Sequence, residues 1–196
     1  MKDKNKIVGS IGLCSVLLFA FALITFGNLN PGFDFMNDYI SKLGAKGEPN
    51  ALCFNIIGFI TVGLLLSTFG LSYGKILKDK ILSILLALFG LGFAFTAIPA
   101  NLEMSTTSVS KAHTVAICLG LACWLFSLSR LGSNQKLKFS IRNRANITAV
   151  LIVISMIGFV LGFWTIPITH RLVFGIVFGW TAISSVGLLI NEKIQK

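Results

Sequence analysis

Residues able to do acid–base or anion-binding chemistry gather in residues 30–50, which read NPGFDFMNDYISKLGAKGEPN and hold three of the chain's seven acidic side chains. Asp38 is a candidate general base, and Lys42 is a candidate for holding an anion. Asp34 and Ser41 would add polar groups to the same ligand-binding site. The pattern leaves open a plainer interpretation, in which these residues form a solvated helix face and Asp38 pairs with Lys42 at i and i+4.

Three polar residues elsewhere could join that segment. His113 is the only ionisable residue within residues 112–129. A titratable group at membrane depth usually faces the interior of a helix bundle, so His113 is a second candidate general base. Arg171 could pair with the loop carboxylates or hold a phosphate through two hydrogen bonds, although an Arg at a helix end also reaches simply to lipid headgroups. Asn55 lies about one turn inside an apolar run and is expected to face neighbouring helices.

Other common chemistries lack their motifs. His113 and His170 do not stand in an H-E-x-x-H pattern or another ligand spacing, so no metal site is predicted and no cofactor is indicated. No G-x-S-x-G sequence and no phosphate-binding loop occurs. The four cysteines all lie in apolar runs without C-x-x-C spacing, and we expect them to be buried and unpaired.

The elements that must position these residues are apolar helices. The chain of 196 residues is 55% hydrophobic and only 12% charged, whereas soluble domains carry about 25% charged residues. A helix of ~20 mainly apolar residues crosses a bilayer core. The sequence therefore predicts an all-α polytopic membrane protein, a single domain over residues 1–196 that is a bundle of six transmembrane helices. Their approximate spans are residues 7–28, 51–74, 81–100, 110–131, 146–166 and 171–191.

A short amphipathic helix is predicted between the first two spans. Met36, Tyr39, Ile40 and Leu43 recur at helical spacing and would form its apolar underside, while Gly44 is placed to end it. Such a segment is expected to lie at the outer membrane interface, with its acidic face either solvated or turned towards a ligand.

The basic residues are distributed unevenly among the connections. With a cytoplasmic N-terminus, 13 of the 17 Lys and Arg residues fall in cytoplasmic segments, and only Lys42, Lys46, Lys111 and Arg171 fall outside. By the positive-inside rule, this bias predicts that both termini are cytoplasmic. The net charge of +10 is then explained by contact with membrane lipids. Nucleic-acid binding is not expected, because no recognition motif accompanies the charge.

Two glycine pairs, Gly158 with Gly162 and Gly175 with Gly179, have the G-x-x-x-G spacing that lets membrane helices approach closely. We expect them to pack inside the bundle rather than to form a dedicated dimer interface, because this motif is common in membrane helices. No internal sequence repeat supports an inverted-repeat transporter.

Several of these motifs occur together in one known family. They are D-x-x-x-D-Y-I-S-K-L-G at residues 34–44, N-x-x-x-x-N-x-x-G at residues 50–58, His113 early in the fourth helix, and Arg171 opening the last helix with Trp180 downstream. In them the chain resembles the prokaryotic membrane family called domain of unknown function 998. The resemblance implies a six-helix bundle in a prokaryotic plasma membrane. It also implies a distant likeness to six-helix proteins of the FRAG/DRAM/Sfk type, which are associated with lipids and lysosomes, and it implies no particular reaction or cofactor.

We therefore predict a protein that binds a lipid headgroup or a small anionic ligand at the extracytoplasmic mouth of the bundle, and the sequence leaves open whether it also modifies that ligand. Two alternatives remain, a small transporter or permease and a non-catalytic membrane partner subunit. Few polar residues lie deep in the spans, which argues against a proton-coupled transporter. The predicted catalytic residues are Asp38 and His113, and the predicted ligand-binding residues are Asp34, Ser41, Lys42, Asn55 and Arg171.

Overall fold

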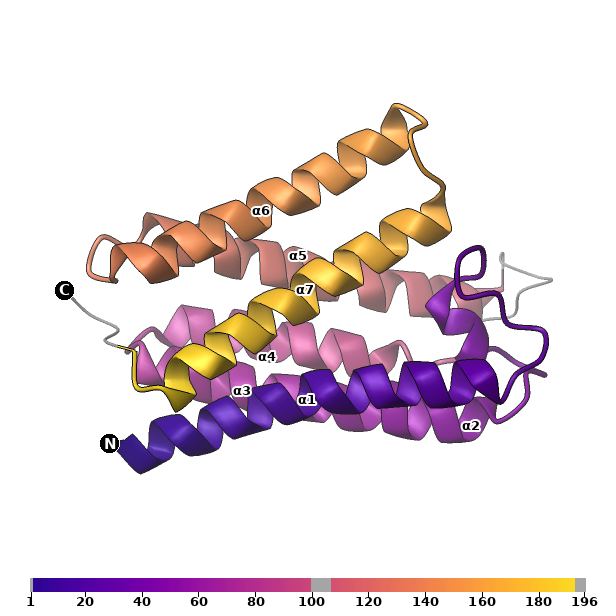
Figure 1. Cartoon of the computed structure of the whole chain (residues 1–196), viewed down its shortest axis with the longest axis horizontal. Coiled ribbons are helices and arrows are strands. Elements are labelled where there is room, and N and C mark those ends of the chain that lie inside the picture. The colour runs from indigo at the N-terminus through magenta and orange to yellow at the C-terminus, as the bar shows by residue number, and fades with distance from the viewer. Residues whose placement is uncertain (1, 100–106, 193–196) are drawn as a thin grey trace.

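Six helical rods make up the part of the chain that the computed structural model describes, residues 2–99 and 107–192, and this part contains no β-strand (Figure 1). Five rods are single helices: α1 (Lys2–Asn28), α4 (Lys80–Phe95), α5 (Ser108–Ser133), α6 (Phe139–Val160) and α7 (Ile166–Leu189). The second rod has three consecutive parts: α2 (Ala51–Phe54), the π-helix η2 (Asn55–Thr61) and α3 (Val62–Ile76). The prediction of an all-α, six-helix protein is confirmed.

The rods form a ring in chain order, because each rod packs against the next and α7 returns to pack against α1. Short connections make rods that follow each other in the chain antiparallel neighbours in space. α1 begins and α7 ends at the same end of the bundle, called the terminal end below (Figure 1). The opposite end carries residues 29–50 and is called the loop end.

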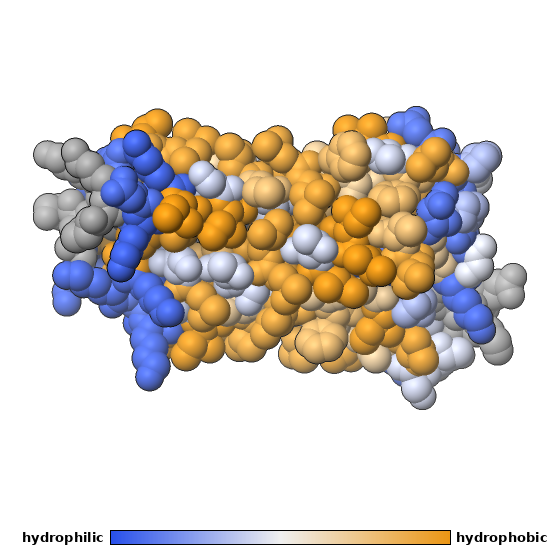
Figure 2. All heavy atoms as spheres, turned by 90° about the horizontal axis from the view of Figure 1, so that it is seen from below, coloured by the Kyte–Doolittle hydropathy of each residue, from blue (hydrophilic) through white to orange (hydrophobic). Residues whose placement is uncertain are grey.

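The length and surface of the rods are those of a membrane protein. Among the described residues, five rods are long and apolar enough to cross a membrane, and α4 is the shorter apolar exception. Figure 2 shows a wide apolar band between two hydrophilic ends. The described Lys and Arg residues predicted to be cytoplasmic lie at the terminal end, in the first turns of α1, between α3 and α4, and around the α5–α6 turn. Which side of the membrane this end faces stays a prediction.

The third rod is shorter than its predicted span of residues 81–100. α4 has 16 residues and is about 24 Å long at 1.5 Å per residue. It ends at Phe95 and is followed by turns over residues 96–98, where the N–H groups bond to carbonyls three residues back. Pro99 explains the early end, since a proline disfavours the helical conformation of the residue before it. Residue 100, the predicted end of the span, lies outside the described residues.

The last two rods begin earlier than predicted. α6 starts at Phe139 instead of residue 146, because the helix continues beyond the apolar run and carries Arg142 and Arg144 in its first turns. α7 starts at Ile166 instead of residue 171. Its Pro167 lies in the first turn, where a proline has no N–H bond to lose and its fixed φ suits a helix.

Glycines bring the backbones of α3 and α4 close together, at positions outside the two G-x-x-x-G pairs named above. A Cβ on Gly70 would stand 2.6 Å from the Cβ of Leu86. A Cβ on Gly74 would overlap Ser83, and one on Gly90 would overlap the backbone of Ser67. Small residues at these positions let the two backbones approach, which replaces the hydrophobic driving force that is missing in lipid.

The glycine pairs that were singled out behave differently. Gly162 lies beyond the end of α6 at φ 75°, and its N–H bonds to the Phe159 carbonyl at 3.0 Å, so it ends the helix. Gly158 packs against the Trp164 ring. A Cβ on Gly175 or Gly179 would meet no atom within 4 Å. A Cβ on Gly162 would also meet no atom within 4 Å, so the prediction of packing inside the bundle is wrong for Gly162, Gly175 and Gly179.

Aromatic side chains fill the axis of the ring. Phe19 and Phe178 stack with their ring centroids 4.4 Å apart, and Phe93 meets Phe178 edge-on at 5.6 Å. Nearer the terminal end, Trp124 and Trp180 are 6.0 Å apart. Each such pair contributes about 0.5–1.5 kcal/mol beyond its burial, so the axis is a packed core. The cysteines are unpaired as expected, but the prediction that they are buried is wrong for three of them, which are exposed: Cys14, Cys53 and Cys118.

The short helix after the first rod is confirmed in position but is smaller than predicted. It is the 3₁₀-helix η1 (Ile40–Gly44), and residues 34–38 form a turn before it. Ile40 and Leu43 are 2% and 1% exposed, whereas Met36 is 60% exposed. η1 therefore presses two apolar side chains into the bundle instead of lying flat on the interface.

Candidate functional site

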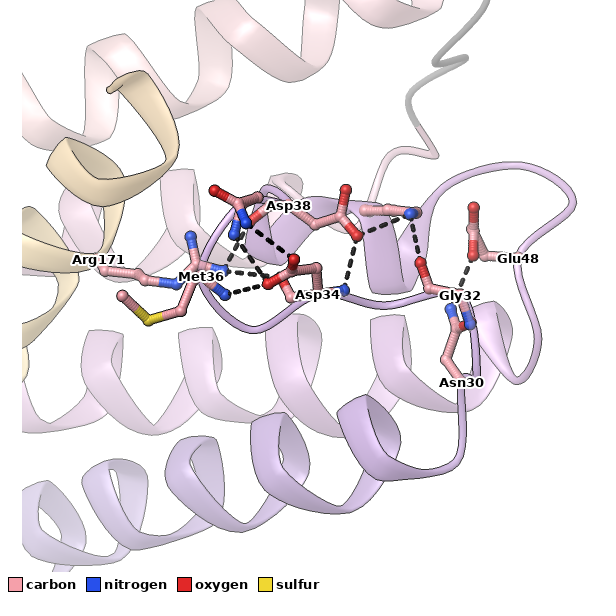
Figure 3. A network of polar contacts seen from close by, with 9 residues as sticks. Asn30, Gly32, Asp34, Met36, Asp38, Glu48 and Arg171 are labelled. Carbon is pink, nitrogen blue, oxygen red and sulfur yellow. Dashed lines mark hydrogen bonds and ion pairs between the residues drawn. The ribbon is translucent and has the colours of Figure 1, made fainter. Parts of the chain in front are cut away.

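The segment that follows α1, residues 29–50, is held by its own polar side chains (Figure 3). Asn30 joins its two ends, because its Nδ2 donates to Glu48 Oε2 at 2.7 Å. The Asn30 Oδ1 accepts a hydrogen bond from the Gly32 N–H at 3.1 Å. Asn30 is 3% exposed, so this junction is buried at the base of the segment.

Asp34 shapes the first turn of the segment. Its Oδ1 accepts the N–H of Met36 at 2.7 Å and that of Asn37 at 3.1 Å, and its Oδ2 accepts Asn37 Nδ2 at 2.8 Å. A carboxylate bonded to following N–H groups is a common local turn, because it replaces backbone pairing. These bonds, that from the Asn37 side chain first, lower the pKa of Asp34 below its usual 3.8.

Asp38 and Lys42 form the predicted i,i+4 pair. Lys42 Nζ lies 2.7 Å from Asp38 Oδ2 and also donates to the Gly32 carbonyl at 2.6 Å. The same Asp38 oxygen accepts the Asp34 N–H at 2.8 Å. Burial acts to raise the pKa of Asp38, but the Asp34 N–H and Lys42 outweigh it and leave the pKa below 3.8.

Arg171 joins this segment to the last helix. Its Nη2 donates to the Asp38 carbonyl at 2.6 Å and, more weakly, to the Asp34 carbonyl at 3.4 Å. Its Nη1 donates to the Pro167 carbonyl of its own helix at 2.9 Å. The predicted pairing of Arg171 with the two aspartates is thus made to their main-chain carbonyls (Figure 3).

Asn55 fixes the other end of η1. It stands where the second rod widens into the π-helix, and its Nδ2 donates to the Gly44 carbonyl at 2.9 Å. A Cβ on Gly44 would overlap the Asn55 side chain, so this contact requires glycine. Asn55 is 5% exposed and faces its neighbours, as predicted. π-helical turns often occur at functional positions, and here the turn positions the side chain that holds η1.

His113 is bound at a different place. It is 6% exposed on α5, and its Nδ1 lies 2.9 Å from the Ile98 carbonyl, just after α4. Because a carbonyl only accepts, we assign the proton to Nδ1, which leaves Nε2 as an acceptor. Within the described residues, His113 makes no hydrogen bond with the network of residues 30–48.

A largely apolar cavity of about 280 Å³ lies between α4, α5, α6 and α7. Its wall includes the first half of α7, the end of α6 and Thr96 after α4. The cavity therefore lies towards the loop end. We call it the loop-end cavity. Phe89, Phe93, Phe174 and Phe178 are among its lining residues. Three further lining side chains are exposed, which opens the cavity to the bundle surface: Met156, Phe159 and Ile166.

His170 contributes the ionisable side chain in the lining of the loop-end cavity. Its Nδ1 is buried without a hydrogen-bond partner among the described residues. The Tyr39 ring, from the turn that Arg171 holds, meets the His170 ring edge-on at 6.2 Å. The segment after α1 is therefore clamped against the wall of the cavity. His113 is bonded to Ile98, two residues after Thr96 of the same wall.

Four of the seven predicted residues form one network, and three do not. The network contains Asp34, Asp38, Lys42 and Arg171. Asn55 bonds to the end of η1, and Ser41 is half-buried on η1 itself. His113 lies apart from both, beside Ile98. Their catalytic and ligand-binding roles stay predictions. No group of three or more His, Cys, Asp or Glu side chains in the described part of the chain is placed to hold a metal ion.

The sequence did not reveal the loop-end cavity or the place of His170 in its wall. Its lining is shared among four helices, and most of the residues that each helix contributes are apolar ones that also serve in ordinary packing. Signals of that kind become visible only when the helices are placed together. The network around Asp34 and Asp38 was visible because its members lie within a few residues of each other.

Comparison with known proteins supports the resemblance drawn from the motifs. A family model described as Protein of unknown function (DUF998) matches residues 13–190. The match covers nearly the whole chain, whereas the distant likeness to FRAG/DRAM/Sfk-type proteins stays a prediction. No curated protein and no solved structure matches the chain.

Proposed function

The chain belongs to the DUF998 family of proteins of unknown function, and we propose that it is a membrane protein that binds a lipid, with an acyl chain in the loop-end cavity and the polar headgroup beside His170. This proposal narrows the prediction of a lipid headgroup or small anion at the mouth of the bundle. The proposal concerns binding only. It is independent of the predicted catalytic roles of Asp38 and His113.

The observation that carries the proposal is the apolar lining of the loop-end cavity. Its volume of about 280 Å³ is near the lower end of ligand pockets, roughly 300–1,000 Å³. Aromatic rings from α4 and α7 are part of its lining, and its exposed side chains belong to the apolar band of the surface. In a bilayer, acyl chains are the apolar molecules in contact with such side chains, so an acyl chain is the ligand of matching chemistry.

The headgroup is assigned to the His170 side on two grounds. The buried Nδ1 of His170 has no partner among the described residues, and an unsatisfied buried polar atom costs about 1–3 kcal/mol. A headgroup hydroxyl or phosphate would supply the missing partner after a small rotation of the ring. Tyr39 packs against the same ring, so under this proposal the segment after α1 would lie beside the headgroup.

The two alternatives fit less well. Aromatic side chains pack along the axis of the helix bundle from Tyr73 to His170. This packing does not favour a path for a polar solute. A partner subunit would find an open groove of about 680 Å³ between α6 and α7, which includes Gly175 and Gly179. That groove supports a docking role as a second candidate, because exposed small residues allow close helix approach.

Native mass spectrometry of the purified protein tests the proposal. Ile117→Trp fills the loop-end cavity, whereas Leu119→Trp places the same ring on the exposed face of the same helix, where Leu119 is 63% exposed. We expect wild type and Leu119→Trp to retain a co-purifying lipid and Ile117→Trp to lose it. Equal lipid retention by a folded Ile117→Trp variant would contradict the proposal.

A further inference from the structure

A second hollow, separate from the loop-end cavity, lies at the terminal end of the bundle. It has a volume of about 640 Å³ and is bounded by the α3–α4 turn, the start of α4 and the α5–α6 turn. We call it the basic hollow. Its charged lining residues are Lys78, Asp79, Lys80, Arg130 and Lys136.

The charges of the basic hollow do not balance. Asp79 is the only acid among its lining residues, all of which are described. The Arg130 Nε lies 2.8 and 2.6 Å from the two oxygens of Asp79, and Asp79 Oδ1 also accepts the Leu82 N–H at 3.0 Å. Burial acts to raise the pKa of Asp79, but these bonds leave it lowered, so the pair stays ionised and neutral overall. Three exposed lysines remain without an acidic partner among the lining residues, so the hollow attracts an added anion.

The backbone at Lys78 is a second observation. Lys78 has a φ of 56°, and the N–H of Asp79 bonds to the Gly74 carbonyl at 2.9 Å, so Lys78 occupies the position after a helix end that glycine usually fills. A non-glycine residue in this conformation carries a backbone cost, which glycine would avoid. Lys78 carries this cost, and its side chain is one of those that line the hollow.

We propose that the basic hollow binds a phosphate group, carried either by an anionic membrane lipid or by free phosphate. The three lysines supply the charge, and the Arg130–Asp79 pair holds the two turns that bear them in place. Basic pockets between membrane helices on the cytoplasmic side are known to take anionic headgroups, and the positive-inside rule predicts that this end is cytoplasmic. This site is at the opposite end of the bundle from the proposed lipid cavity and does not depend on it.

Basic residues at this end also serve membrane insertion, so the test must separate a built site from general surface charge. Lys78→Gly combined with Lys136→Gln removes two charges from the hollow, and the first change relieves the backbone. Lys6→Gln combined with Lys75→Gln removes two exposed charges at the same end outside the lining. Both double variants have the same net charge.

Retention of phosphatidylglycerol and of phosphatidylcholine is then measured by native mass spectrometry for wild type and both double variants. We expect phosphatidylglycerol binding to weaken about fivefold for each lysine lost from the hollow, the factor equivalent to about 1 kcal/mol, with phosphatidylcholine binding unchanged. The control variant should stay within about twofold of wild type, because Lys6 and Lys75 do not line the hollow and contribute only a screened, longer-range attraction. Equal weakening in both double variants, or in neither, would overturn the proposal.

A second arm distinguishes the sources of the phosphate. Inorganic phosphate is added to delipidated protein in neutral detergent, with chloride at matched ionic strength as the control. A thermal stabilisation by phosphate that the Lys78→Gly, Lys136→Gln variant lacks assigns free phosphate as a ligand. Stabilisation by phosphatidylglycerol alone, lost in the same variant, assigns the lipid headgroup. No stabilisation by either probe contradicts a phosphate site.

Discussion

Arg171 on the last helix donates a hydrogen bond of 2.6 Å to the main-chain carbonyl of Asp38, 133 residues earlier in the chain. A guanidinium bonded to carbonyl oxygens fixes backbone position, whereas one bonded to carboxylates would fix only side chains. The contact therefore places the turn before η1, and with it Tyr39, against the His170 wall of the loop-end cavity. The polar segment after α1, called the clamped segment below, is thus held against that wall, and its two aspartates stabilise it by accepting hydrogen bonds from its own backbone.

Replacing Arg171 should loosen the clamped segment. Arg171→Gln removes bonds that a charged donor makes to two carbonyls, the shorter of which is worth about 1.5–3 kcal/mol at most. We expect backbone amides in residues 34–44 to exchange at least tenfold faster, with little change in α3 and α4, as measured by hydrogen–deuterium exchange. Lys111→Gln removes another exposed charge from the same end and serves as the control. Unchanged exchange in the Arg171 variant would show that the clamp is unimportant.

The contact between Gly44 and Asn55 predicts a coupled pair of substitutions. Gly44→Ala should destabilise the protein by about 2–3 kcal/mol, because the added methyl overlaps the Asn55 side chain. Asn55→Ala loses the bond to the Gly44 carbonyl but makes room for that methyl, so the double variant should be less destabilised than the sum. Gly32→Ala, whose Cβ would meet ordinary contact at 3.6 Å, is the control. Strict additivity in thermal unfolding would refute the overlap.

Acidification should destabilise the clamped segment. The pKa of Asp38 is lowered from 3.8 in the folded protein, so its stabilising effect is complete above the unfolded value and is lost as the pH falls through the folded value. The difference in melting temperature between wild type and Asp38→Asn should be constant above about pH 5 and shrink below it. Asp3→Asn, at the other end of the bundle, controls for the loss of one negative charge. A difference that persists undiminished to roughly pH 2 would contradict this assignment.

The predicted orientation is tested by labelling. A membrane-impermeant thiol reagent should react with Lys46→Cys in intact cells, because Lys46 is exposed at the loop end. Lys136→Cys, exposed at the terminal end, should react only after lysis. The native cysteines are first replaced by alanine, since Cys53 is exposed near the start of the second rod, at the loop end, and would react with the reagent. The reverse pattern would place both termini outside.

Much of the fold could be predicted because apolar length is a local signal. The six rods follow from it, and the errors lie at their ends. α6 extends past the apolar run through Arg142 and Arg144, since a helix does not stop where hydrophobicity stops. Helix packing was less predictable. The G-x-x-x-G spacing of Gly175 and Gly179 is the same as that of Gly70 and Gly74, but only the second pair meets a neighbouring helix.

The candidate site shows the same division. The i,i+4 pair of Asp38 and Lys42 was predictable from spacing and is present. Two other features depend on contacts between segments far apart in the chain. Arg171 binds main-chain carbonyls, and His170 lies in an apolar wall. No local pattern encodes such contacts, which is why the sequence left the role of residues 30–50 open.

The central claim is that an acyl chain occupies the loop-end cavity. The most direct test is photocrosslinking with a phospholipid that carries a diazirine near the middle of one acyl chain, followed by mass-spectrometric mapping of the labelled residues. We predict labelling concentrated on the lining residues Met156, Phe159 and Val173, and its loss in Ile117→Trp but not in Leu119→Trp. Labelling spread evenly over exposed side chains such as Leu17, Leu52 and Phe126, and unaltered by Ile117→Trp, would contradict the claim.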